Sequence, residues 1–144
     1  MFTQTIEKTQ LESSESYQLI KDEQLASVVI SSQILAGSRI LLSTYRQVVF
    51  SDCVFYACDF QGVTFENCVF ENCSFEFTHL KKCNFKNCNF TNCTWVAATS
   101  RNSIYVDCDL TYEHQVALEG SGNTLHFASK HHTTDIYIEM ALAA

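Results

Sequence analysis

Large apolar side chains recur at every fifth position through the middle of the chain. From Ile30 to Leu110, 16 of the 17 positions in this series are large and apolar or aromatic, and Ser100 is the exception. The residues two places earlier are small or β-branched at 16 of 17 positions, and Gln33 is the exception. A period of five matches neither the 3.6 residues of a helical turn nor the two-residue alternation of a strand. The chain must therefore turn a corner in every repeat and bring one large and one small side chain inward.

The residue that follows each large position by two places is suited to a tight turn. Glycine and asparagine tolerate a positive φ at the third position of a type II turn. Aspartate, a weaker form of the same preference, occupies the slot at Asp52 and Asp107. The remaining positions are mostly polar, which predicts that they face outward. The glycines and asparagines of the slot are Gly62, Asn67, Asn72, Asn87, Asn92 and Asn102.

The segments CVFENCSF at residues 68–75 and CNFKNCNF at residues 83–90 resemble the repeats of the pentapeptide repeat family. In that family a small residue, a polar residue, Leu or Phe, a polar residue and often Gly or Asn follow one another. The resemblance covers residues 26–110. It implies an all-β fold, a right-handed quadrilateral parallel β-helix with four pentapeptides per coil and about four coils.

A coil of four pentapeptides would stack each side chain on the equivalent side chain of the next coil. Adjacent strands lie about 4.7–4.9 Å apart, and each buried phenylalanine contributes about 1.5–3 kcal/mol. Trp95, followed by Ser100, interrupts the pattern and predicts a local distortion with Trp95 turned outward. The coil from Ala26 to Tyr45 lacks Cys and Phe at the key positions and is expected to be less regular. The predicted core comprises Phe50, Cys53, Phe55, Cys58, Phe60, Phe65, Cys68, Phe70, Cys73, Phe75, Cys83, Phe85, Cys88, Phe90, Cys93, Cys108 and Leu110.

Both ends of such a column expose core side chains and need caps. Residues 1–25 are predicted to form an N-terminal cap, with a short helix over Ser14–Leu25. Residues 111–144 are predicted to form a C-terminal segment that begins with a helix over Thr111–Glu119. Apolar and other residues then alternate with period two, which predicts a hairpin or a pair of strands. This segment either caps the last coil or pairs with a second copy of the chain, as a homodimer, through an open sheet edge. The residues expected to do so are Leu125, Phe127, Ile136, Ile138 and Met140.

The composition describes a folded domain, because 47% of the 144 residues are hydrophobic and 17% are charged. No stretch approaches the 18 consecutive apolar residues of a transmembrane helix. The N-terminus lacks the basic start and apolar run of a signal peptide. We therefore expect a cytoplasmic protein that does not enter the membrane, with its eight cysteines reduced.

The net charge of −7 is concentrated at the two ends of the chain. Residues 1–25 hold five acids and two bases, which gives −3, and residues 111–144 hold four acids and one base, which also gives −3. Residues 26–110 hold seven acids and six bases, which gives −1. The repetitive part is nearly neutral. Its cluster of Lys81, Lys82 and Lys86 is either a solvated basic patch or a contact for an acidic partner, and is too small to predict direct nucleic-acid binding.

The cysteines and histidines do not form a recognisable metal or catalytic motif. Zinc ligands usually converge in pairs at C-x2-4-C spacing, whereas the C-x4-C spacing here follows from the repeat and places the thiols on successive faces. Adjacent His131 and His132 are interpreted as solvated loop residues, and His79, His114 and His126 as isolated structural or surface residues. We therefore expect no cofactor, no metal and no enzymatic activity.

Three functions remain open from the sequence. The first is a rigid, non-catalytic protein-interaction scaffold, whose partner the sequence does not identify. The second comes from the family resemblance: some pentapeptide repeat proteins mimic duplex DNA and bind type II topoisomerases, which requires a strongly acidic column. The third, also from the family, is a small regulatory or effector protein. The asparagines of the turn slot are either a binding surface or residues suited to the backbone conformation.

Overall fold

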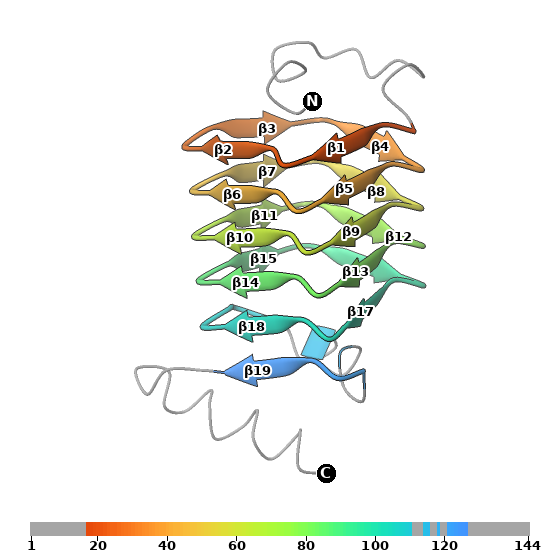
Figure 1. Ribbon diagram of the computed structural model, residues 1–144. Helices are drawn as coiled ribbons and strands as arrows, with labels where there is room; N and C mark the ends of the chain where they lie inside the picture. Colours follow the sequence, from red (N-terminus) through yellow and green to blue (C-terminus); the bar gives the residue numbers. More distant parts are fainter. Residues whose placement is uncertain (1–16, 111–113, 116–117, 119–120, 127–144) are drawn as a thin grey trace.

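The computed structural model is a column of stacked coils with four sheets around one core (Figure 1). It describes residues 17–110, 114–115, 118 and 121–126. Each strand pairs in parallel with its equivalent one coil further along the chain, as Phe70 does with Phe50 and Phe90. The predicted quadrilateral parallel β-helix is therefore confirmed. No helix in the described residues is long and apolar enough to cross a membrane.

The four sheets are named here faces A to D in the order in which the chain visits them. Face A contains β1 (Leu19–Lys21), β5 (Arg39–Leu41), β9 (Asp59–Gln61), β13 (His79–Lys81) and β17 (Thr99–Arg101). Face B contains β2 (Gln24–Ala26), β6 (Thr44–Arg46), β10 (Thr64–Glu66), β14 (Asn84–Lys86), β18 (Ile104–Val106) and β19 (Thr124–His126). Face C contains β3 (Val29–Ser31), β7 (Val49–Ser51), β11 (Val69–Glu71) and β15 (Asn89–Thr91). Face D contains β4 (Ile34–Ala36), β8 (Val54–Tyr56), β12 (Ser74–Glu76) and β16 (Thr94–Val96).

Every strand from β1 to β18 places its middle residue inward, and the large apolar residues of successive coils stack there. The rings of Phe50 and Phe70 are 4.8 Å apart and 5° from parallel, and those of Phe70 and Phe90 are 4.8 Å apart and 3° from parallel. All side chains of the predicted core are buried except Cys93, which is half-buried. Cys93 precedes β16, and among the described residues no further strand of face D follows β16 to cover it.

The small inward position accepts cysteine, serine or threonine because each can donate to a main-chain carbonyl. The Cys73 thiol donates to the carbonyl of Phe50 in the preceding coil, at 3.3 Å. The Thr78 hydroxyl makes the equivalent bond to Phe55 at 2.8 Å. The hydrogen bond is not required, because Val48 and Val63 are also buried at this position, so the cysteines are one of several small residues that meet its packing requirement.

The chain turns each corner through a residue with positive φ. This conformation recurs at every fifth residue from Tyr17 to Asp107. It is adopted by the predicted asparagines and by Gly62, and also by bulky residues such as Leu42 (φ 51°) and Phe77 (φ 50°). The left-handed conformation costs non-glycine residues about 1–2 kcal/mol each, so the regular ladder on either side must impose it.

The prediction that Trp95 turns outward is wrong. Its ring stacks on Phe75 at a centroid distance of 4.6 Å, and β16 is a regular strand. Ser100 also fits without distortion, because its buried hydroxyl shares a hydrogen bond of 2.8 Å with the Tyr105 hydroxyl.

The N-terminal coils are more regular than the sequence suggested. Strands β3 to β6 have the same length and burial as later strands, so the expected irregularity of Ala26–Tyr45 is wrong. Within the predicted Ser14–Leu25 helix, Leu19–Lys21 is a strand and Gln24 and Leu25 begin another. Regular coils thus begin at Leu19, ahead of the expected start at residue 26, because parallel pairing with the next coil outweighs local helix propensity.

The C-terminal segment continues the column rather than folding back from it at residue 124. Strand β19 pairs in parallel with β18, in the same coil register, which aligns Leu125 with Tyr105. Leu125 is half-buried and packs against the core. His114, Gln115 and Leu118, within the predicted Thr111–Glu119 helix, are helical and buried. The other residues predicted to cap or dimerise, Phe127, Ile136, Ile138 and Met140, lie outside the described residues.

Candidate functional site

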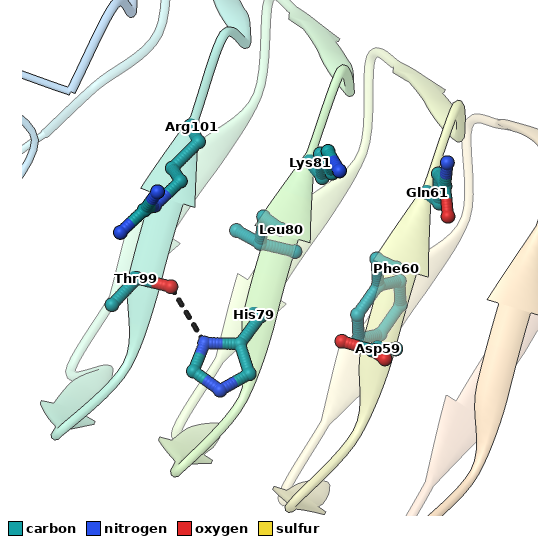
Figure 2. A pocket seen from close by; sticks show the side chains of 8 residues that line it. All are labelled: Asp59, Phe60, Gln61, His79, Leu80, Lys81, Thr99 and Arg101. Carbon is teal, nitrogen blue, oxygen red and sulfur yellow. Dashed lines mark hydrogen bonds between the residues drawn. The ribbon is translucent and has the colours of Figure 1, made fainter.

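A groove of about 370 Å³ crosses face A over strands β9, β13 and β17. Two rows of outward side chains form its walls, and Phe60 and Leu80, whose side chains point into the core, form its floor (Figure 2). Each row is created by the stacking of coils, because equivalent positions of successive strands are direct neighbours. The rows are Asp59, His79 and Thr99 on one side, and Gln61, Lys81 and Arg101 on the other.

In one row, a carboxylate (Asp59), an imidazole (His79) and a hydroxyl (Thr99) are neighbours on successive strands. His79 Nδ1 lies 2.6 Å from Thr99 Oγ1, within hydrogen-bond distance (Figure 2). Within the described residues, no hydrogen bond joins Asp59 to His79. The main-chain amides beside them are already used, since His79 N donates to Cys58 O and Thr99 N donates to Thr78 O. The row therefore has side chains of acid–base type but no free amides nearby to stabilise an oxyanion intermediate.

The opposite row is cationic and unpaired. Lys81 and Arg101 are equivalent residues of successive coils, and each is exposed. Arg46 and Glu66 form a salt bridge of 3.0 Å on face B, but neither Lys81 nor Arg101 has a salt-bridge partner in the described part of the chain. The groove thus combines two free cations with a single carboxylate, in a chain whose net charge is −7.

The corner between faces D and A carries a second surface feature, an exposed stripe of Tyr17, Tyr56, Phe77 and Val96. Their side chains are 82%, 45%, 50% and 51% exposed, respectively. The rings of Tyr56 and Phe77 contact each other edge to face at 5.6 Å. The Tyr17 ring lies against Gly37, where an added Cβ would come within 2.6 Å of two ring atoms. We call these four residues the corner stripe.

The buried cysteines have the properties of core residues. Burial raises the pKa of the Cys58 and Cys83 thiols to about 11, so both remain protonated at neutral pH. A protonated, buried thiol is neither a nucleophile nor a good metal ligand. Among the described residues, no group of three or more His, Cys, Asp or Glu side chains is arranged to hold a metal ion.

The structure separates the basic cluster that the sequence suggested. Lys81 lies in the groove on face A, Lys82 occupies the corner between faces A and B, and Lys86 lies on face B. The sequence reasoning missed Arg101, which joins Lys81, and the row that contains His79. The 20-residue spacing of Lys81 and Arg101, and of Asp59, His79 and Thr99, places them at the same position of successive coils and could have revealed both rows.

The asparagines of the turn slot have the positive φ that the turn requires. Asn67 and Asn87 occupy the corner between faces B and C, with φ of 54° each. Asn72 and Asn92 occupy the corner between faces C and D, with φ of 55° and 53°. Their conformation accounts for their presence. His126 is exposed on β19, and His131 and His132 lie outside the described residues.

The four sheets, the constant coil register and the left-handed corners define a parallel β-helix built of five-residue units. Residues 46–94 match the family model of the pentapeptide repeats, which spans nine copies of the repeat. Residues 46–94 therefore consist of pentapeptide repeats. No curated protein matches it in sequence.

Several solved structures show distant similarity. A candidate glycosyl hydrolase of Parabacteroides merdae is 14% identical with a TM-score of 0.40, and the match covers 72% of this chain and 64% of that one. HetL of Nostoc, a pentapeptide repeat protein involved in the regulation of heterocyst differentiation, is 10% identical with a TM-score of 0.30, over 66% of this chain and 46% of that one. QnrB1, a plasmid-mediated fluoroquinolone resistance protein, is 12% identical with a TM-score of 0.24, over 88% of this chain and 90% of that one. The chain therefore spans less than two thirds of the first two proteins.

Proposed function

We propose that this protein is a non-catalytic scaffold that binds an apolar segment of a partner protein along the corner stripe. The observation that carries the proposal is Phe77. It is half exposed although it is large and apolar, and it occupies a corner position with φ of 50° where asparagine would be less strained. Exposed apolar patches mark interaction surfaces.

The stripe is long enough to accept an extended segment. Four coil spacings separate the corner of Tyr17 from the corner beside Val96, a distance of about 19 Å at about 4.8 Å per coil. Between Tyr17 and Phe77 the corner positions are Gly37, which the Tyr17 ring covers, and Ala57. Apolar side chains of a partner can pack against the exposed faces of the rings along this edge.

The partner must contact side chains rather than extend a sheet at the sides of the column. Along each face, the main-chain groups of neighbouring coils bond to one another, for example from Phe77 N to Val96 O at 2.9 Å and from Ala57 N to Glu76 O at 2.8 Å. An added β-strand needs a free edge. The outward side chains therefore carry recognition on the faces and corners.

The groove on face A gives little support to catalysis. Its hydroxyl and imidazole lie in contact, but the neighbouring amides donate within the ladder and the carboxylate does not orient the imidazole. A triad needs both features. The DNA-mimic alternative requires an acidic surface, whereas this groove holds Lys81 and Arg101 against one carboxylate. A supercoiling assay with a type II topoisomerase is expected to show no effect of the protein.

Site-specific photo-crosslinking tests the proposal. A photo-crosslinking phenylalanine analogue replaces Phe77 in one variant and Asn67, at the opposite corner between faces B and C, in the control. Both positions are exposed and have positive φ, of 50° and 54°. In the native cell we expect a discrete adduct with a second protein from position 77 only, and its loss when Val96→Asn is added.

Three outcomes would count against the proposal. The first is no adduct at position 77, and the second is the same adducts at both positions. The third is an adduct that contains only two copies of this chain, which would make the corner stripe a self-association surface instead.

A further inference from the structure

The cations of the face A groove are placed to act together on one ligand. Lys81 and Arg101 project from the same position of adjacent strands β13 and β17, one coil spacing of about 4.8 Å apart. Both side chains are exposed and lack a salt-bridge partner in the described part of the chain. Because both side chains are long and flexible, their charged ends can be brought to different oxygens of one phosphate or carboxylate group.

His79 supplies a third donor from the facing row. Its Nδ1 lies 2.6 Å from the Thr99 hydroxyl. When that hydroxyl donates to Nδ1, the proton of the neutral ring resides on Nε2, so Nε2–H is available to a ligand. In this arrangement of the hydrogen bond, Thr99 holds the ring with its Nε2–H directed to the ligand. Figure 2 shows His79 and Lys81 on the same strand, β13, with Thr99 and Arg101 on the next strand.

Asp59 restricts where an anion can lie. It occupies the strand on the other side of β13, in direct register with His79. Its negative charge repels an anion near β9 and favours a position between β13 and β17. The same charge disfavours a continuous polyanion running along the whole groove. The groove therefore fits a single compact oxyanion better than a nucleic-acid backbone.

We propose that the groove on face A binds one oxyanion, a phosphate or carboxylate group, between Lys81, Arg101 and His79. This site is separate from the corner stripe, so it does not rest on the proposed function. The anion is either a free phosphate or an acidic side chain of a bound protein, since both present negatively charged oxygen atoms that accept hydrogen bonds. The two sources are distinguished by the choice of ligand.

The test is an NMR titration of the full chain with inorganic phosphate and, separately, with a blocked triglutamate peptide, at constant ionic strength. The reporter is the Cε1–H signal of His79. We expect a saturable shift of this signal with at least one of the two ligands. Tighter binding of phosphate would identify a free phosphate as the source, and tighter binding of the peptide would identify acidic side chains.

Four variants sharpen the test. Lys81→Gln and Arg101→Gln are each expected to weaken binding about tenfold, the factor for one lost charge-assisted hydrogen bond. Lys21→Gln is the matched control, because Lys21 occupies the same row of face A on β1, outside the groove. Asp59→Asn is expected to tighten binding about twofold by removing a repulsive charge.

The proposal would be overturned by either of two results. One is a shift of the His79 signal that does not saturate with either ligand. The other is equal weakening in Lys21→Gln and Arg101→Gln, which would indicate a general charge effect. Because all four substitutions are at exposed positions, unchanged circular dichroism spectra are expected to exclude unfolding as the cause.

Discussion

Acidification is expected to release the helical residues 114, 115 and 118 from the end of the column through protonation of His114. The His114 side chain is only 4% exposed, and its ring lies 4.1 Å from that of Trp95 and 5.0 Å from that of Phe90. Burial lowers the pKa of His114 from 6.5 to about 3. At a mildly acidic pH, His114 therefore stays neutral while it is buried and becomes protonated once it is exposed to solvent.

The size of the effect follows from that difference. Because the folded pKa lies below the unfolded one, the stabilisation is complete above pH 6.5 and is lost as the pH falls toward 3. Each pKa unit corresponds to about 1.36 kcal/mol. Between pH 7 and pH 5 the docked state should lose about 2 kcal/mol, and between pH 7 and pH 3 about 4 kcal/mol.

Fluorescence of Trp95, the single tryptophan, measures the release directly. We expect its emission to change between pH 7 and pH 4 in the wild-type protein, before the far-ultraviolet circular dichroism of the coils changes. His114→Leu keeps an apolar side chain that cannot titrate and serves as the control. Equal pH dependence of denaturant-induced unfolding in the wild type and this variant would refute the reasoning.

Two further predictions concern the core and the corners. Phe70→Ala should reduce the free energy of unfolding by about 3–5 kcal/mol, because Phe70 stacks on Phe50 and Phe90 at 4.8 Å; a loss below about 1 kcal/mol in urea unfolding would contradict a continuous aromatic core. Phe77→Asn should raise the free energy of unfolding by about 1 kcal/mol, because asparagine tolerates the φ of 50° and removes an exposed ring. A thermal unfolding midpoint below that of the wild type would show that the ring stabilises the column.

The fold could be predicted because its inward positions obey one strict rule. The column needs a large apolar residue and a small one in every pentapeptide, so the period is visible without any other information. The start of the coils was harder to predict. Ile20 and Leu25 keep the large series, but Gln18 and Glu23 occupy the small positions before them. The structure accommodates Glu23 at the column's end, where its carboxylate accepts a hydrogen bond of 3.0 Å from the Tyr45 hydroxyl.

The parallel pairing of β19 with β18 was harder to predict for a different reason. Alternation around Leu125 fits both a hairpin and another parallel rung, since both place alternate side chains on one face. The only feature that favours a parallel rung is that Leu125 lies 20 residues, one full coil, after Tyr105. The five-residue period is lost between Tyr105 and Leu125, where Gln115 and Gly120 occupy the large positions.

The groove and the corner stripe were not predicted because outward residues are free to vary. No packing rule fixes Asp59, His79 or Thr99, so their relation appears only when the chain is wrapped at four pentapeptides per coil. Phe77 gave a weak signal, as a bulky residue where glycine or asparagine is expected. The fold tolerates it because the ladder on both sides holds the corner.

The fixed coil length also determines how this surface responds to insertions. Adding one pentapeptide before Asp59 would move every later side chain by one face, yet all inward positions would remain correct. Adding one pentapeptide between His79 and Thr99 would divide the groove between two faces and leave the core continuous. Adding a full coil of four pentapeptides would lengthen the column by one rung and return each face to its register. Length and surface pattern are therefore separable properties of this chain, and a site on one face can be rotated as a unit without redesign of the interior.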